Sequence, residues 1–182
     1  MTPVFRLLCG LLLLPAVALA GKHEKPAPVA ADHDQLVILV RHAEKALDQG
    51  SDPALTARGE ARAQSLAALL KPAGVGAIIT TEWQRTRATA APLAAALGVT
   101  PVVVSTSSAD KGGADAHPRA VADAVRAQSA DIVLVVGHSN TLPAIIAALG
   151  GPAIADLGDD EYGNFYTLWR HQGKATLVQS RY

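Results

Sequence analysis

The sequence is poor in cysteine and aromatic residues and carries no net charge, and each of these absences limits what the protein can be. Of 182 residues, one is cysteine, 4% are aromatic, and 16 Lys and Arg balance 16 Asp and Glu. A single cysteine excludes an internal disulfide framework and a cysteine-rich metal site. Balanced charge without a basic cluster gives no indication of nucleic-acid binding. The length fits one domain, and 49% hydrophobic residues supply a full core.

The first 20 residues have the pattern of a secretory signal peptide. Arg6 precedes an apolar stretch that ends in the small-residue motif Ala18-Leu19-Ala20. The stretch is short for a membrane span, which needs about 20 apolar residues, so we expect cleavage after this motif rather than an uncleaved anchor. Cys9 would leave with the peptide. We therefore predict export, to a bacterial periplasm, and no membrane span in the mature chain.

The next residues separate the signal peptide from the domain. Residues 21–35 mix Lys, His, Glu, Pro and Ala without periodicity, which is typical of a disordered leader. Residues 36–182 are expected to form the domain. It opens with Leu36–Val40, five apolar residues of which three are β-branched, and this pattern predicts a buried central strand.

Strands and helices are predicted to alternate along the domain. The predicted strands are 36–40, 75–80, 100–104 and 131–136; the predicted helices are 56–71, 82–97, 117–128 and 140–150. Thr56, Thr80 or Thr81, and Asn140 or Thr141 are the expected caps of three of these helices. Two last strands, 164–170 and 175–179, form a hairpin around Gln172-Gly173. The order predicts an α/β fold of three layers: a mostly parallel central sheet, helices on both faces and a C-terminal β-hairpin.

Four basic side chains follow three of the predicted strands. Arg41 and His42 end the first strand, Arg85 lies in the first turn of the helix after the second, and His138 follows the fourth. Taken alone, Arg41 and His42 would be equally typical of polar residues at a strand end. Parallel strands, however, bring such loops to one edge of the sheet, where open α/β sheets bind ligands. We therefore expect the four side chains to converge.

Two Arg and two His suit phosphoryl transfer through a covalent intermediate. Arginine binds phosphate oxygens bidentately and stays charged, and helix N-termini add N–H donors. A neutral imidazole is a competent nucleophile when its other nitrogen is held by a hydrogen bond. A second, protonated histidine would stabilise the transferring oxygens. This chemistry requires neither a metal nor a cofactor, and it implies a small phosphorylated substrate.

The motifs resemble those of the histidine phosphatase superfamily, also called phosphoglycerate-mutase-like. They are Arg41-His42, Leu55-Thr56-x-x-Gly59, Gln84-Arg85-Thr86-Arg87-x-Thr89-Ala90 and Gly137-His138-Ser139. Each motif alone is weak, but their order and spacing are specific. The resemblance implies that His42 is phosphorylated, that Arg41 and Arg85 bind the phosphate, and that His138 completes the pocket.

Some positions depart from the family pattern. Ala43 replaces the usual glycine after the Arg-His pair, where a positive φ would be strained. The family's acidic residue after the third strand is not evident, and Asp110 and Asp115 are the candidate general acids in the loop that follows. Glu44 and Asn140 are candidate substrate contacts, but Glu44 is equally typical of a surface ion pair. The phytase-like motifs and the mutase insertions are absent.

Three functions remain open from the sequence. The first is an exported phosphatase acting on phosphomonoesters. The second is a phosphohistidine or phosphoprotein phosphatase, which the small size fits but export does not. The third is a phospho-ligand-binding module without catalysis. The phosphatases need a nucleophilic His42, whereas a binder needs only the two arginines. The physiological substrate and the oligomeric state are not indicated.

Overall fold

The computed structural model describes residues 33–48, 50–107 and 115–182, so the predicted signal peptide and most of the predicted leader lie outside the described residues. The elements in chain order are β1 Gln35–Arg41, α1 Ala57–Leu70, the 3-10 helix η1 Lys71–Ala73, β2 Ala77–Thr80, α2 Gln84–Leu97, β3 Val102–Val103, α4 Ala116–Arg126, β4 Ile132–Gly137, α5 Leu142–Ala148, β5 Asn164–His171 and β6 Lys174–Arg181. None of the described helices is long and apolar enough to cross a membrane.

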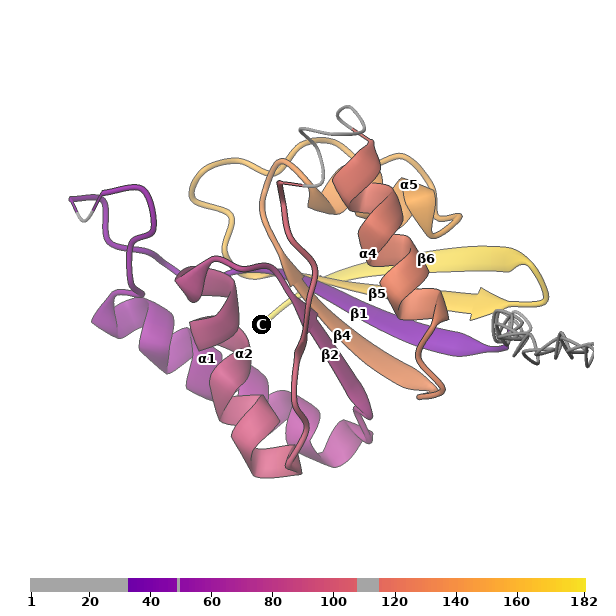
Figure 1. Ribbon diagram of the computed structural model, residues 1–182, viewed down its shortest axis with the longest axis horizontal. Helices are drawn as coiled ribbons and strands as arrows, with labels where there is room; N and C mark the ends of the chain where they lie inside the picture. The colour runs from indigo at the N-terminus through magenta and orange to yellow at the C-terminus, as the bar shows by residue number, and fades with distance from the viewer. Residues whose placement is uncertain (1–32, 49, 108–114) are drawn as a thin grey trace, which may run out of the picture.

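The strands form one six-stranded sheet in the order β3-β2-β4-β1-β5-β6. The first four strands of this order are parallel, β5 is antiparallel to β1, and β6 is antiparallel to β5. Helices α1 and α2 lie on one side of the sheet and α4 and α5 on the other (Figure 1). The predicted three-layer α/β fold with a mostly parallel sheet and a C-terminal hairpin is therefore confirmed.

The central strand β1 contributes to both halves of the core because successive side chains of a strand point to opposite faces. Val37 and Leu39 pack in the cluster that includes α4 and α5, whereas Ile38 and Val40 pack in the cluster that includes α1 and α2. All four side chains are at most 3% exposed. Burial on both faces explains why this stretch of the sequence is continuously apolar.

The third predicted strand is much shorter than expected. Only Val102 and Val103 pair, with Ile79 and Thr80 of β2. They lie at the edge of the sheet and both side chains are exposed. A very short edge strand offers few unpaired backbone groups to another chain.

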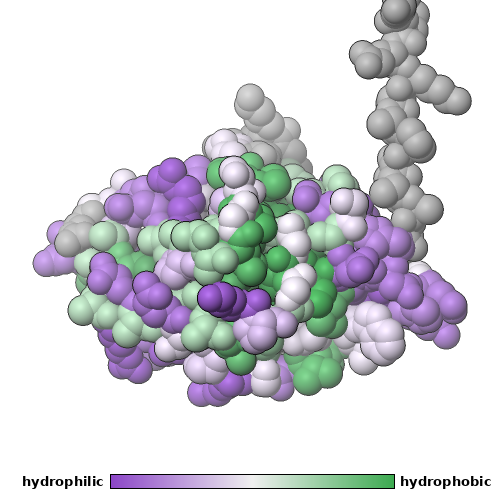
Figure 2. Space-filling view, turned by 90° about the horizontal axis from the view of Figure 1, so that it is seen from below, coloured by the Kyte–Doolittle hydropathy of each residue, from purple (hydrophilic) through white to green (hydrophobic). Residues whose placement is uncertain are grey.

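The face shown in Figure 2 carries hydrophobic residues toward its middle, with hydrophilic residues around them.

The C-terminal hairpin turns at the predicted residues. Gln172 and Gly173 have φ of 49° and 73°, the left-handed pair that a two-residue type I′ turn requires. Gln172 is the one non-glycine residue with positive φ in the described part of the chain. Ala43 therefore sits in its turn without the strain that a positive φ would cause.

Only one of the predicted helix caps is found. The Thr56 side chain accepts a hydrogen bond from the Gly59 N–H and caps α1, as expected. Neither Thr80 nor Thr81 caps α2; instead the carboxylate of Asp52 accepts from the Gln84 N–H. Helix α5 likewise has no side-chain cap from Asn140 or Thr141. Thr81 instead lies 3.0 Å from His138 of another loop, whereas the Thr141 hydroxyl bonds the backbone of His138 within its own turn.

Gly59 lies where α1 touches the loop after β1, the close approach that its place in a helical turn suggests. A Cβ at this position would lie 2.2 Å from the backbone oxygen of Glu44. That oxygen also accepts from the Thr56 N–H at 2.9 Å, so it is held in place. The absence of a side chain thus lets α1 support the residues that follow His42.

We expect Gly59→Ala to destabilise the fold although alanine is the better helix former. Alanine gains about 1 kcal/mol in helix propensity, but overpacking against a fixed backbone costs about 1–3 kcal/mol or more. Urea denaturation should therefore show a net loss, whereas the exposed helix substitution Gln64→Ala should change the unfolding free energy by less than about 0.5 kcal/mol. An unchanged or higher midpoint for Gly59→Ala would contradict this packing.

Candidate active site

The two histidines meet because β1 and β4 are parallel neighbours in register. Arg41 pairs with Gly137, and the next N–H, that of His42, donates to the Gly137 oxygen at 2.9 Å. His42 and His138 therefore leave adjacent strands at the same edge. Their rings lie 5.4 Å apart in an edge-on arrangement.

His42 is held in the tautomer that a nucleophile needs. Its Nδ1 lies 2.8 Å from the Ala43 oxygen. Because a carbonyl oxygen only accepts, Nδ1 carries the proton and Nε2 keeps its lone pair. Burial, and to a smaller extent the charges of Arg85 and Arg41, lower the pKa of His42 from 6.5 to about 4. The imidazole is therefore neutral at neutral pH.

Arg85 reaches the same place from the first turn of α2. Thr89, one turn later on α2, donates to the Arg85 oxygen at 2.8 Å and accepts from the Ala43 N–H at 2.9 Å. This hydroxyl ties α2 to the turn after His42. The Arg85 guanidinium lies 4.7 Å from the Trp83 ring centre and 3.7 Å from the Asp52 carboxylate. Its Nε and Nη1 are buried and have no hydrogen-bond partner among the described residues.

Arg41 is anchored by the loop that precedes β5. Its Nη1 donates to the backbone oxygens of Gly158 and Asp159, both at 2.8 Å, and its guanidinium lies 4.1 Å from the centre of the Tyr162 ring. The Tyr162 ring is also 6.0 Å from the His42 ring. Tyr162 therefore covers the Arg41–His42 pair on one side. The Nε of Arg41 has no partner among the described residues.

A chain of hydroxyls orients His138. Its Nε2 lies 3.0 Å from the Thr81 hydroxyl, which lies 2.9 Å from the Thr86 hydroxyl, which donates to the Trp83 oxygen at 2.8 Å. Each hydroxyl has one proton and the chain ends on a carbonyl, so the protons point from His138 toward Trp83. This direction makes Nε2 the donor and leaves the lone pair on Nδ1.

Without a bound phosphate, the protein holds His138 neutral. Burial, and to a smaller extent the charges of His42 and Arg85, lower its pKa from 6.5 to about 3. A bound dianion would act with the opposite sign and raise that pKa. Binding of a dianion should therefore draw a proton onto His138.

We expect sulfate, which stays a dianion between pH 5 and 7, to bind more tightly as the pH falls. The free histidine binds no proton in this range, so uptake of one proton strengthens binding by up to about tenfold per pH unit. Isothermal titration calorimetry at pH 5, 6 and 7 would measure the trend, and His138→Asn should flatten it. An affinity of the wild type that does not change with pH would contradict the coupling.

A cleft of about 560 Å³ opens beside these residues. Three elements supply most of its lining: the start of α2, the start of α4 and the turn after β4. The lining residues are Trp83, Arg85, Thr106, Asp115, His117, Pro118, His138, Asn140, Thr141 and Ala144. Asn140, a candidate substrate contact, is thus at the cleft. Arg41 lines a second depression on the far side of Tyr162, of about 490 Å³.

Of the candidate acidic residues, Glu44 is bound by arginines, whereas Asp115 lines the cleft. The Glu44 carboxylate accepts two hydrogen bonds from Arg62, both at 2.8 Å, and also pairs with Arg58. Of the two alternatives for Glu44, the structure shows the ion pair. The Asp115 side chain is 71% exposed and pairs with Arg119. Asp110 lies outside the described residues.

Sequence reasoning missed several residues that shape the site. Tyr162 follows three acidic residues, a pattern typical of an exposed loop, and Thr81 was an expected helix cap. Thr89 belongs to the arginine motif, and that motif was the one signal that pointed to it. Nothing in the sequence marked His117. Among the described residues, no group of three or more His, Cys, Asp or Glu side chains is arranged to hold a metal ion.

Comparisons with known proteins agree with the motifs. Residues 37–107 match the family model described as histidine phosphatase superfamily (branch 1). This segment includes Arg41, His42 and Arg85 but ends before His138. No curated protein matches the sequence.

The fold is similar to those of several solved structures. One is an Escherichia coli protein assigned as an alpha-ribazole-5'-P phosphatase, with a TM-score of 0.62, 18% identity and coverage of 81% of this chain and 96% of the other. Another is a mycobacterial glucosyl-3-phosphoglycerate phosphatase, with a TM-score of 0.59, 15% identity and coverage of 82% of this chain and 99% of the other. A third is a Nakamurella protein assigned as the phosphohistidine phosphatase SixA, with a TM-score of 0.55, 25% identity and coverage of 81% of this chain and 96% of the other. The sequence match over residues 37–107 agrees with the histidine phosphatase superfamily that the motifs resemble, and the similarity to these solved structures shows a common fold.

Proposed function

We propose that this chain is an exported phosphatase that hydrolyses phosphomonoesters through a phosphohistidine on His42, without a metal ion. One observation carries the proposal above the others. The His42 ring has Nδ1 bound to a carbonyl and a pKa of about 4, so Nε2 is an available nucleophile at neutral pH. It stands beside two arginines and a second histidine.

The residues divide the reaction between them. Arg85, whose buried Nε and Nη1 have no hydrogen-bond partner among the described residues, holds the phosphoryl oxygens and offsets their charge. Arg41, fixed by two carbonyls, adds a second positive charge next to the nucleophile. Nε2 of His42 attacks phosphorus, the bond to the leaving oxygen breaks, and a phosphohistidine forms. His138 takes up a proton and stabilises the charge on the transferring oxygens. Water then attacks phosphorus and releases phosphate.

A second candidate is a phosphatase of phosphohistidine or phosphoprotein. The similarity of fold to the Nakamurella protein assigned as SixA, at 25% identity, supports this candidate. A non-catalytic binding module is the third candidate. It would keep Arg41 and Arg85 but would not need the tautomer lock on His42, which therefore favours an enzyme.

A phosphatase panel on the purified chain without residues 1–20 tests the proposal. The panel contains 4-nitrophenyl phosphate, glycerol phosphate and a phosphohistidine-bearing protein, each with and without EDTA. We expect phosphate release from the monoesters and no effect of EDTA. Turnover of the phosphohistidine protein alone would establish the second candidate. Phosphate binding without turnover would establish the binding module, and loss of activity in EDTA would contradict a metal-free reaction.

Export rests on the signal-peptide pattern of residues 1–20, the basic residue, apolar stretch and Ala-x-Ala motif described above. Mass spectrometry of the protein recovered from the periplasm of a bacterial host should find an N-terminus at Gly21. Recovery of the intact chain from the membrane fraction would indicate an anchor instead.

A further inference from the structure

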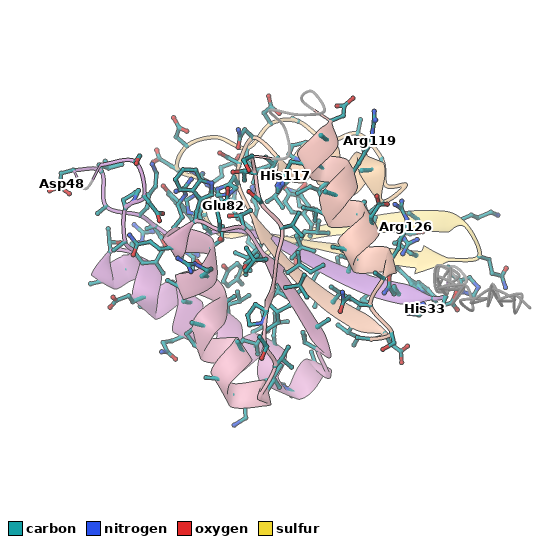
Figure 3. The ribbon with its side chains drawn as sticks, viewed as in Figure 1. His33, Asp48, Glu82, His117, Arg119 and Arg126 are labelled. Atoms are coloured by element: carbon teal, nitrogen blue, oxygen red, sulfur yellow. The ribbon has the colours of Figure 1, made fainter. Side chains whose placement is uncertain are left out.

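The cleft contains a third histidine that the mechanism above does not use. His117 lies in the first turn of α4 and is 2% exposed. It lines the same cleft as Arg85 and His138, and its charge is close enough to lower the pKa of His138. Figure 3 shows His117 on the side of α4 that faces Glu82, at the start of α2, whereas Arg119 and Arg126 lie on the other side of the helix.

The His117 ring is oriented by one nitrogen and unpartnered at the other. Its Nδ1 lies 3.1 Å from the Ser105 oxygen, which only accepts, so Nδ1 carries a proton. Nε2 is buried and has no hydrogen-bond partner among the described residues. A buried polar atom without a partner is costly. A histidine that served only to fill space would therefore be a costly choice at this position, whereas a histidine that exchanges a proton needs a nitrogen open to the cleft.

The Ser105 segment is itself fixed to the start of α2. The Glu82 carboxylate accepts from the Thr106 N–H and from the hydroxyls of Thr106 and Ser105, at 2.6–3.2 Å. The Trp83 Nε1–H also donates to the Thr106 hydroxyl, at 3.0 Å. The carbonyl that orients His117 is thus held on the element that carries Arg85.

Two carboxylates near the site, those of Glu44 and Glu82, are poor proton donors because the protein stabilises their ionised forms. Hydrogen bonds from Arg62 lower the pKa of Glu44. The pKa of Glu82 is also lowered, since its hydrogen bonds from Thr106 and Ser105 outweigh the effect of burial. Asp115, which also lines the cleft, pairs with Arg119 at 3.2 Å. An alkyl phosphate nevertheless needs a proton on its leaving oxygen, and an imidazole can exchange a proton near neutral pH.

We propose that His117 is the general acid and base of this phosphatase; the inference rests on the proposed function. As Nε2 of His42 bonds to phosphorus and the bond to the leaving oxygen breaks, the proton on Nε2 of protonated His117 passes to that oxygen and the alcohol departs. His117 is then neutral. In the second step its Nε2 takes a proton from water, whose oxygen attacks phosphorus and breaks the bond to His42. Phosphate leaves, and both histidines return to their starting states.

Two substitutions separate proton transfer from packing. His117→Asn places an amide N–H where Nδ1 lies and keeps a donor for Ser105, whereas His117→Gln places an amide near the position of Nε2. Neither amide transfers a proton. The matched control is His171→Asn, because His171 ends β5 at the opposite edge of the sheet and its side chain is half exposed.

The experiment compares kcat for glycerol phosphate and 4-nitrophenyl phosphate in the wild type and the three variants, with circular dichroism to verify folding. Both His117 variants should lose about 10²–10⁴-fold with glycerol phosphate. They should lose less than about tenfold with 4-nitrophenyl phosphate, whose leaving group is stable as an anion. His171→Asn should match the wild type with both substrates.

Other outcomes overturn the inference in distinguishable ways. In a His117 variant that is folded, kcat could fall equally with both substrates or not fall with either. Either result would show that His117 is not the acid, and the proposed function would still stand. A wild type that hydrolyses neither substrate would overturn the proposed function and this role together.

Discussion

His42→Ala is expected to reduce phosphate release by at least about 10⁴-fold, because the loss of a covalent nucleophile leaves only binding and charge stabilisation. The wild type, quenched during turnover, should carry phosphate that is labile to acid and stable to alkali, as expected for a phosphohistidine. The variant should carry none. Turnover with radiolabelled 4-nitrophenyl phosphate, followed by acid and alkali quenches, measures both.

The variant should still fold. The His42 ring contacts the rings of His138 and Tyr162 rather than the two apolar clusters that hold the sheet and helices together. His171→Ala, remote from the site, controls for the loss of an imidazole and should retain full activity. If His42→Ala turns over substrate as fast as the wild type, the covalent mechanism on this residue is wrong.

Arg85→Ala should produce the second large effect, a loss of affinity for vanadate or phosphate. Its Nε and Nη1 are buried without a hydrogen-bond partner among the described residues, and Nη1 lies 3.7 Å from the Asp52 carboxylate, so both can still donate to phosphate oxygens. Truncating one partner of a desolvated charge pair costs about 2–5 kcal/mol, which corresponds to roughly 30-fold to a few thousand-fold in the inhibition constant. Inhibition of 4-nitrophenyl phosphate hydrolysis by vanadate measures it.

Two matched arginine variants make the result specific. Arg87 lies two residues further along α2 and is exposed, so Arg87→Ala should leave the inhibition constant unchanged. Arg85→Lys keeps the charge but loses the planar fork and should give an intermediate value. Arg41→Ala should also weaken binding, because a second positive charge is lost. An inhibition constant that is the same in Arg85→Ala and the wild type would remove this residue from the phosphate site.

The sequence by itself determined the features that depend on local patterns. The apolar run from Leu36 to Val40 predicts a central strand because such a strand is buried on both faces. Gln172-Gly173 predicts a tight hairpin because few residue pairs accept two positive φ angles. Gly59 in a helical turn predicted a close backbone approach, and Glu44 lies there. Parallel strands also predicted that Arg41, His42, Arg85 and His138 would meet.

Only the tertiary structure decided which side chains are partners across loops. Glu44 binds Arg62, Thr81 binds His138, and the Asp52 carboxylate caps α2. Each pair joins segments that the chain order leaves far apart, and no local pattern distinguishes the partner from its neighbours. The sheet order β3-β2-β4-β1-β5-β6 brings them together.

The same reason explains why the sequence missed two residues of the site. Tyr162 covers Arg41 because β5 is antiparallel to β1, so the loop before β5 returns to the edge where β1 ends. His117 lines the cleft because the start of α4 lies against the segment after β3, where the His117 Nδ1 is 3.1 Å from the Ser105 oxygen. Local sequence specifies where strands and helices begin and end, whereas the packing of the sheet decides which polar groups are buried and which partners they find.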